Sequence, residues 1–175
     1  MSYRCTPNLA RKISAHNSKI LNNSKNEQGD AAKKKECNCR KYVCPVDGKC
    51  LTEGVVYQAT LRRGDGVVDT YIGLTATSFK ERWRNHISNF KTRNPKNATA
   101  LSKHIWQLED KTIEYEVSWK IVSRAKPFNH VTGVCHLCNR EKYFIIFKPE
   151  MATLNERNEI AGPCLHKHSK LLKRS

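Results

Sequence analysis

The sequence has no run of about 18 apolar residues, such as a membrane-spanning helix needs, and no apolar signal core near its N-terminus. We therefore expect neither a membrane span nor secretion. Acidic residues are also scarce, with 16 Asp and Glu against 32 Lys and Arg and a formal net charge of +16. This excess indicates a polyanionic partner, although ribosomal and membrane-surface proteins share it. We find no internal repeat.

The length of 175 residues suits one compact domain of about 100–150 residues with peripheral segments. We expect a linker or connector over residues 1–36, a cysteine-rich knot over 37–54, a core over 55–170 and a basic tail over 171–175. A short basic helix is predicted at Asn8–Leu21. The rest of the first segment has the polar composition of a solvated linker.

A hairpin followed directly by a helix is predicted at the start of the core. Val55–Leu61 and Thr70–Leu74 are rich in the β-branched and aromatic residues that favour strands. Gly64-Asp65-Gly66 between them is a turn signal that closes an antiparallel hairpin. The helix begins near Ser78, which has capping-box spacing to Glu81. Its apolar stripe is bordered by Arg82 and His86 and consists of Phe79, Trp83, Ile87 and Phe90.

The remaining pattern completes an α+β fold. A second helix is expected over Ala98–Leu108, with His104 at the border of its apolar stripe. We expect this histidine to be packed rather than catalytic. Apolar residues alternate with polar ones over Ile113–Ile121, which predicts a half-buried third strand. The fold class is therefore a small three-stranded antiparallel sheet flanked by helices.

The first core helix and the loop after it carry a basic stripe. Only one acid, Glu81, lies between Ser78 and Lys103. Contacts from such a stripe to phosphate carry no sequence information, and a solvated face is the alternative. The candidate nucleic-acid contacts are Lys80, Arg84, Lys91, Arg93, Lys96 and Lys103.

Eight cysteines without a secretory signal favour metal ligands over disulfides. Four of them fall within 14 residues and can close around one tetrahedral Zn²⁺, namely Cys37, Cys39, Cys44 and Cys50. Two disulfides or free thiols are the alternative, because a Cys-x-Cys pair is strained when both residues bind one ion.

A second zinc site is expected at Cys135 and Cys138, which have Cys-x-x-Cys spacing. A redox role is disfavoured because no βαβ pattern surrounds them. The site needs two further ligands, for which Cys164 and His166 are the nearest candidates, with His168 or His136 as alternates. We therefore expect about two structural Zn²⁺ per chain.

Three motifs in order resemble the core of the GIY-YIG endonucleases: Val55-Val56-Tyr57, Tyr71-Ile72-Gly73 and Phe79-x-x-Arg82-Trp83-x-x-His86. The first keeps the tyrosine and departs from Gly-Ile-Tyr in its first two letters. The cysteine-rich segments before and inside the core resemble those of Penelope-like retroelements. Residues 3–17 resemble the connector that follows the reverse-transcriptase domain in these elements.

The resemblance implies a catalytic set of Tyr57, Tyr71, Arg82, His86, Glu141 and Asn155. Glu141 would be the single protein ligand of one Mg²⁺ or Mn²⁺. Arg82 would clamp the scissile phosphate with its guanidinium fork. Tyr57 would take the proton of the attacking water, for which a phenol with a pKa of about 10 needs cationic help. Tyr71 and His86 would orient phosphate or relay the proton, and Asn155 would support the site.

The function expected from this resemblance is a metal-dependent DNA endonuclease. It would nick a target duplex and leave a 3′-hydroxyl that primes the reverse transcriptase of the same polyprotein, in the nucleus. Element RNA is a second candidate partner. Two alternatives stay open: a catalytically silent zinc-bearing module that binds DNA or RNA on the same scaffold, and a basic zinc protein that tethers a partner through its N-terminal segment.

Overall fold

The computed structural model describes residues 9–26, 36–40, 43–126, 128–129, 132–156, 164 and 166. The predicted connector on either side of the first helix, His168 and the tail 171–175 lie outside them. Within the described ranges, no helix is both long and apolar enough to cross a membrane. The elements are α1 (Leu9–Asn26), β1 (Glu53–Arg63), β2 (Val68–Ser78), α2 (Phe79–Thr92), α3 (Ala100–Asp110), β3 (Tyr115–Arg124), β4 (Phe128–Asn129), β5 (Val134–Cys135) and α4 (His136–Phe147), with 3₁₀ turns at Pro95–Asn97 and Pro149–Met151.

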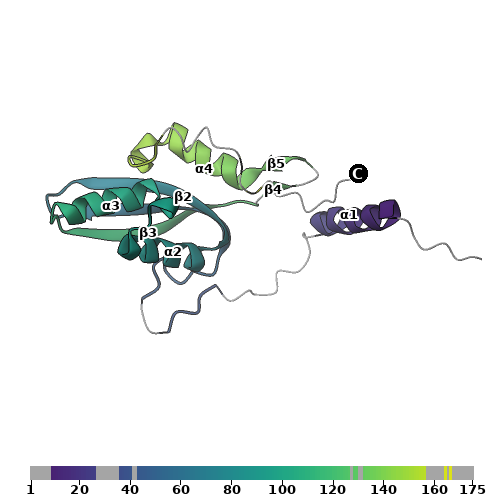
Figure 1. Ribbon diagram of the computed structural model, residues 1–175, viewed down its shortest axis with the longest axis horizontal. Coiled ribbons are helices and arrows are strands. Elements are labelled where there is room, and N and C mark those ends of the chain that lie inside the picture. The colour runs from purple at the N-terminus through teal and green to yellow at the C-terminus, as the bar shows by residue number, and fades with distance from the viewer. Residues whose placement is uncertain are drawn as a thin grey trace, which may run out of the picture.

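Strands β1, β2 and β3 form an antiparallel sheet in the order β2-β1-β3 (Figure 1). This confirms the predicted α+β class and its three-stranded antiparallel sheet. The hairpin strands are longer than expected, because pairing continues to Arg62 and Val68 and leaves only a tight turn between them. The short pair formed by β4 and β5 was not predicted.

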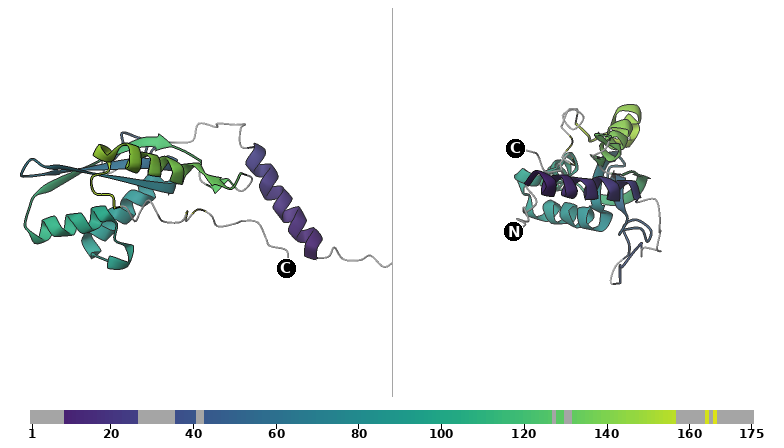
Figure 2. Two further views of the ribbon diagram at one scale, coloured as in Figure 1. Left: turned by 90° about the horizontal axis from the view of Figure 1, so that it is seen from above. Right: turned by 90° about the vertical axis from the view of Figure 1, so that its right-hand side faces the viewer.

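Helices α2 and α3 cover one face of the sheet, and α4 covers the other (Figures 1 and 2). Side chains alternate between the two faces along each strand. Tyr57 and Tyr71 accordingly join the core beneath α2 and α3. Val56 and Ile72 join the core beneath α4. Two separate apolar cores therefore flank one sheet.

Helix α2 begins as the sequence indicates. Ser78 is its N-cap, and its side chain accepts a hydrogen bond from the Glu81 amide at 3.4 Å. Phe79 and Phe90 are buried as predicted. His86 differs from the expectation of a border position, since only 2% of it is exposed.

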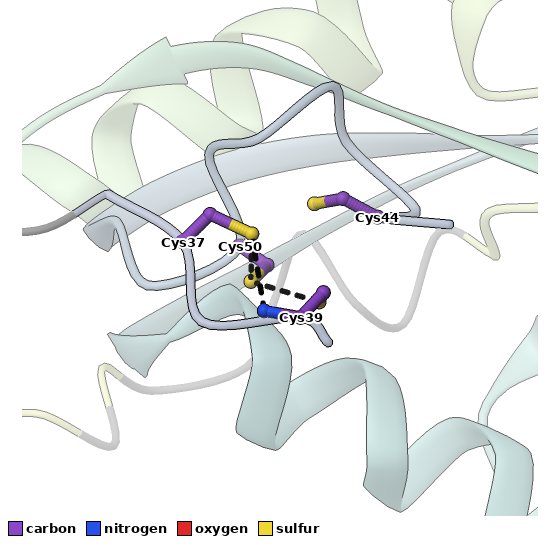
Figure 3. A group of neighbouring side chains, drawn as sticks. All are labelled: Cys37, Cys39, Cys44 and Cys50. Atoms are coloured by element: carbon purple, nitrogen blue, oxygen red, sulfur yellow. Dashed lines mark hydrogen bonds between the residues drawn. The ribbon is translucent and has the colours of Figure 1, made fainter. Parts of the chain in front are cut away.

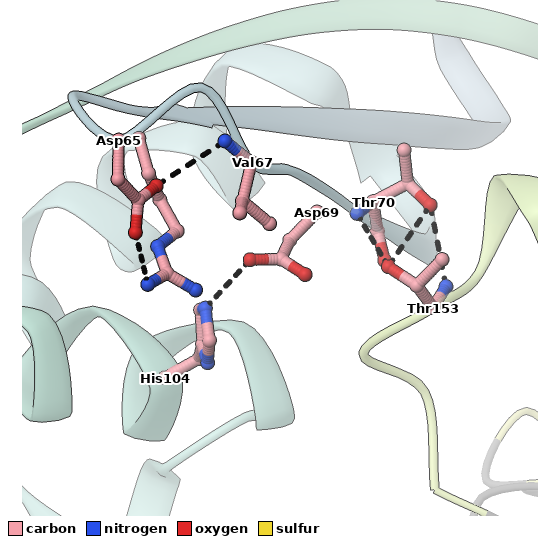
Figure 4. A network of polar contacts seen from close by, with 7 residues as sticks. Asp65, Val67, Asp69, Thr70, His104 and Thr153 are labelled. Atoms are coloured by element: carbon pink, nitrogen blue, oxygen red, sulfur yellow. Dashed lines mark hydrogen bonds and ion pairs between the residues drawn. The ribbon is translucent and has the colours of Figure 1, made fainter.

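The outer edge of β2 is covered by the chain that follows α4 (Figure 4). The Thr70 amide donates to Thr153 Oγ1 at 2.8 Å, and the Leu154 amide donates to the Thr70 carbonyl at 2.9 Å. These bonds satisfy backbone groups that an edge strand would otherwise present to another chain. Next to them, His104 Nε2 lies 3.0 Å from Asp69 Oδ2 and joins α3 to β2, in line with the packing role that we expected for His104.

Candidate functional site

The Tyr57 hydroxyl is the centre of a polar cluster inside the core beneath α2. It lies 2.8 Å from His86 Nε2 and accepts a hydrogen bond from Arg82 Nε at 3.0 Å. Tyr71 also hydrogen-bonds to Arg82. The structure thus brings Tyr57, Tyr71, Arg82 and His86 together as the motifs predict, and we call these four residues the tetrad.

Electrostatics fix the charge of each partner around this hydroxyl. Burial, reinforced by the nearby Arg82 guanidinium, lowers the pKa of His86 to about 3. Burial also disfavours the charge of Arg82, but Tyr57 and Tyr71 outweigh it and hold the pKa of Arg82 above its usual value. At neutral pH the tetrad therefore contains a neutral imidazole and a fixed cation.

Gly73 makes room for the Tyr57 hydroxyl. Tyr57 and Gly73 are cross-strand partners in the β1–β2 ladder. A Cβ at position 73 would lie 2.5 Å from the Tyr57 hydroxyl oxygen and 2.9 Å from the Tyr71 ring. Any larger residue would collide with both tyrosines. Steric exclusion therefore explains why glycine occupies the last position of Tyr71-Ile72-Gly73.

A polar cleft of about 810 Å³ lies beside the tetrad, between α2 and the loop that precedes α3. Arg82 and His86 are in its lining, whereas Tyr57 and Tyr71 are not, and Tyr57 has no exposed surface. No acid is among the described lining residues, the others being Asn85, Ser88, Asn89, Thr92, Asn94, Lys96, Asn97, Ala98 and Thr99. This wall was not predicted, although Asn85 and Asn89 at a spacing of four indicate a polar face on α2.

Glu141 and Asn155 come from the other side of the sheet. Glu141 lies on α4 between Leu137 and Ile145, which pack on the core opposite the tetrad. Asn155 lies beside the edge strand, where its side chain accepts from the Ile72 amide and donates to the Ile72 carbonyl, both at 2.8 Å. Asn155 thus holds the backbone between Tyr71 and Gly73, a supporting role. Glu141 belongs to α4, which packs on the face of the sheet opposite α2, the helix that carries Arg82.

The basic side chains of the predicted stripe differ in their surroundings, since some are exposed and others pair with acids. Arg84, Lys91 and Lys96 are exposed. Arg93 already pairs with Glu109 at 3.0 Å and Asp110 at 2.6 Å, because α3 brings acids that are distant in sequence. Lys103 lies 3.9 Å from Glu156 in an exposed pair. Such pairs contribute little to stability and compete only weakly with a polyanion.

Lys80 requires a correction, because it does not belong to the basic surface. Only 8% of it is exposed. Its ammonium donates to Asn38 Oδ1 at 2.6 Å and to Cys39 Sγ at 3.7 Å. Lys80 therefore points into the cysteine knot, and helical periodicity alone could not reveal this.

The four cysteines of the first knot gather as predicted (Figure 3). Their sulfur atoms all lie within 4.8 Å of one another, and Cys50 Sγ is 3.6 Å from both Cys37 Sγ and Cys39 Sγ. Bonds of about 2.3 Å around a tetrahedral Zn²⁺ require S···S edges of about 3.8 Å. The donor set and its spacing fit this ion.

The local environments of the thiols in this knot shift their pKa values in opposite directions. Burial raises the pKa of Cys44, but hydrogen bonds from the backbone at Val46 and Gly48 outweigh it and bring the pKa to about 7. Cys50 is fully buried, and this burial raises its pKa to about 12. Since zinc binds thiolates, the lowered pKa favours Cys44 as a ligand at neutral pH.

The second cluster consists of Cys135, Cys138, Cys164 and His166, and its ligand atoms also lie within 4.8 Å of one another. Cys138 Sγ is 3.4 Å from Cys164 Sγ and 3.2 Å from His166 Nδ1. Both Cys164 and His166 thus meet the Cys-x-x-Cys pair, as predicted. Cys135 is also the N-cap of α4, so a metal here would fix the start of the helix that carries Glu141.

Comparison of the chain with models of known families, with curated proteins and with solved structures finds no match. The resemblance to GIY-YIG endonucleases therefore depends on the three motifs and on the arrangement of the residues within them.

Proposed function

We propose that this chain is a metal-dependent DNA endonuclease domain of the GIY-YIG type, which hydrolyses a phosphodiester of a target duplex. The observation that carries the proposal is the Tyr57 hydroxyl held between Arg82 Nε and the neutral His86, beside an acid-free cleft. Two of the three sequence motifs supply these groups, and Tyr71 of the remaining motif hydrogen-bonds to Arg82. Hydrolysis of a phosphodiester requires a group that activates water and a cation that stabilises the developing charge, and this arrangement places a hydroxyl and a guanidinium together.

Arg82 contacts the scissile phosphate in this proposal, because it combines a fixed charge with a position in the cleft wall. Its guanidinium has five N–H donors, of which the tyrosines occupy only a part. The tyrosines therefore hold the guanidinium in place while it binds phosphate oxygens. A rigid cation of this kind stabilises the charge that develops on the phosphoryl group.

His86 orients the Tyr57 hydroxyl rather than storing its proton. A histidine whose pKa is lowered to about 3 is neutral at neutral pH, and in this proposal it is the tautomer that accepts from the Tyr57 hydroxyl at Nε2. The remaining lone pair of Tyr57 can then accept a hydrogen bond from water. Because Tyr57 is fully buried, this step requires that its hydroxyl become accessible to water when DNA binds.

The reaction would consume one water, break the bond between phosphorus and the 3′ oxygen, and leave a 3′-hydroxyl and a 5′-phosphate. We propose one Mg²⁺ or Mn²⁺ with Glu141 as its protein ligand, to supply Lewis-acid chemistry. The described lining of the cleft includes no carboxylate, and Glu141 belongs to α4, on the face of the sheet opposite α2. The cleft alone therefore does not supply a ligand set for this ion.

The wider proposal follows the same resemblance. The domain would serve a Penelope-like retroelement in the nucleus, where the 3′-hydroxyl primes reverse transcription by an attached polymerase domain. Target DNA is the main partner and element RNA the second. The two cysteine clusters would each hold one structural Zn²⁺.

One observation favours a second candidate function, a non-catalytic nucleic-acid-binding module on this scaffold. The helices that carry the proposed metal-binding carboxylate, Glu141, and the proposed phosphate clamp, Arg82, pack on opposite faces of the sheet. In that case Arg82, Lys96 and the asparagine-rich cleft would bind phosphate without cutting it.

Nicking of supercoiled plasmid with Mg²⁺ or Mn²⁺ separates the two candidates. The parent should nick, and polymerase should extend the nick without phosphatase treatment, because it ends in a 3′-hydroxyl. Arg82→Ala and Glu141→Ala should each reduce the rate by about a hundredfold or more while duplex binding, measured by fluorescence anisotropy, persists. Exposed residues outside the proposed site provide the controls Arg62→Ala and Glu114→Ala, which should nick normally.

Tyr57→Phe tests the central hydroxyl by removing one oxygen atom. We expect a loss of nicking of about a hundredfold or more with unchanged DNA binding. Tyr115→Phe is the control, since its hydroxyl donates to Glu109 at the surface. A parent protein that binds duplex but nicks with neither ion would support the binding module, and nicking by both Arg82→Ala and Tyr57→Phe at the parental rate would refute the site.

A further inference from the structure

Lys80 is a buried cation in the first turn of α2, and its contacts are with the cysteine knot. Its ammonium donates to Asn38 Oδ1 and to Cys39 Sγ. A buried ammonium is costly unless a partner compensates its charge, and the amide of Asn38 is neutral. Cys39, which contacts this ammonium, carries the opposite charge when it is a thiolate.

A zinc ion in this knot would create that charge. Four cysteine thiolates around Zn²⁺ sum to a net charge of about −2, because each thiolate contributes one negative charge. Hydrogen bonds and cations beside metal ligands tune the affinity of a site. The 3.7 Å contact from Lys80 Nζ to Cys39 Sγ has the geometry of a charge-assisted N–H···S bond.

We propose that Lys80 is the charge-compensating partner of the zinc knot, and that through it the metal holds the first turn of α2 and thereby positions Arg82. This inference depends on the zinc site of the proposed function and not on nuclease activity. Lys80 is a positioning residue, because it contacts a metal ligand and not the substrate.

The backbone supplies the mechanical connection. The Lys80 amide donates to the Cys50 carbonyl at 2.7 Å, and the Phe79 amide donates to the Thr52 carbonyl at 3.0 Å. These amides belong to the first turn of α2, where helical amides have no partner within the helix. Cys50 and Phe79 share the core that contains Tyr57. Metal, Lys80 side chain and first turn thus form one continuous unit, and Arg82 follows two residues later.

Zinc affinity tests this inference without any activity measurement. Zinc release to a chromophoric chelator should show two zinc ions per chain in the parent. Lys80→Met keeps the aliphatic length but removes the charge. This variant should lower the affinity for one of the two zinc ions by about tenfold to a hundredfold. Lys80→Arg should retain most of the affinity. Lys91→Met, an exposed change on the same helix, should have no effect.

The site at Cys135, Cys138, Cys164 and His166 is the internal reference, because it lies on the other side of the sheet and its zinc should be unaffected. Cobalt substitution adds a spectroscopic readout, since the sulfur-to-cobalt absorption of the first knot should shift in Lys80→Met. Hydrogen exchange should quicken at the amides of Phe79 and Lys80 in this variant, but not in α3.

The outcomes distinguish this inference from the proposed function. The role of Lys80 would be overturned if both the parent and Lys80→Met bind two zinc ions tightly and the Phe79 amide exchanges hydrogen at an unchanged rate. That result would leave the endonuclease proposal intact. A folded parent that holds no zinc would overturn it as well. Failure of plasmid nicking alone, with the expected zinc results, would overturn the endonuclease and leave this inference standing.

Discussion

Acidification should destabilise the protein through His86. This residue is 2% exposed, accepts or donates at the Tyr57 hydroxyl, and has a pKa lowered from 6.5 to about 3 by burial and by Arg82. The unfolded chain therefore binds a proton at His86 in a pH range where the folded chain does not. Stability must rise with pH across that range and fall as the pH drops from 6.5 toward 3.

The magnitude follows from the two pKa values. Each pH unit within the range costs about 1.4 kcal/mol of unfolding free energy, because one proton is taken up on unfolding. Between pH 7 and pH 5, His86 alone should remove about 2 kcal/mol of stability. Protonation of carboxylates and of zinc ligands adds to the total, so the contribution of His86 has to be measured as a difference between two proteins.

Urea unfolding of the parent and of His86→Gln across pH 5 to 7 isolates this difference. Glutamine can still accept from the Tyr57 hydroxyl but does not titrate, so the variant should lose about 2 kcal/mol less than the parent over this interval. Equal pH dependence in the parent and His86→Gln, or an NMR titration of His86 with a midpoint near 6.5, would refute the reasoning.

Three further predictions test neighbouring features. Gly73→Ala should lower the unfolding free energy by about 1–3 kcal/mol, because the added Cβ overpacks against Tyr57. Gly64→Ala should be tolerated, since its Cβ would meet its neighbour at 3.5 Å. Equal melting temperatures of the two variants would contradict this prediction. Asn155→Ala should cost about 1–3 kcal/mol and speed exchange of the Ile72 amide, and unchanged exchange would argue against its role at the edge. Metal-free protein at neutral pH should be alkylated first at Cys44, with zinc protecting it; peptide mapping that finds another thiol first would reverse this.

Local sequence signals were sufficient for the sheet and for the start of α2. Alternation of apolar residues marked β3, the Asp-Gly turn marked the hairpin, and the spacing of Ser78 and Glu81 marked the N-cap. The spacing of the cysteines likewise indicated both clusters, which the folded chain brings together. In each case the deciding interactions lie within a few residues in sequence or depend on residue type alone.

Features that depend on distant contacts were missed or misjudged. Lys80 has the spacing of a surface residue on α2, yet it contacts the knot at residues 41 and 42 positions earlier in the sequence. Arg93 is part of an acid-poor segment, yet α3 brings Glu109 and Asp110 to it. His86 is at the border of an apolar stripe, yet the sheet buries it. Periodicity describes one helix, and burial depends on what the rest of the chain packs against it.

The edge strand β2 joins the two halves of the proposed site. Helices α2 and α4 both pack against it, one on each face, and the segment ending at Asn155 runs along its outer edge. Tyr71 points to the Arg82 side and Ile72 to the Glu141 side. A phosphodiester that meets both Arg82 and an ion on Glu141 must therefore lie across this edge rather than inside the cleft alone. Because Asn155 is bonded to Ile72, its removal should disturb both halves together, whereas a module that only binds phosphate would need just the Arg82 side.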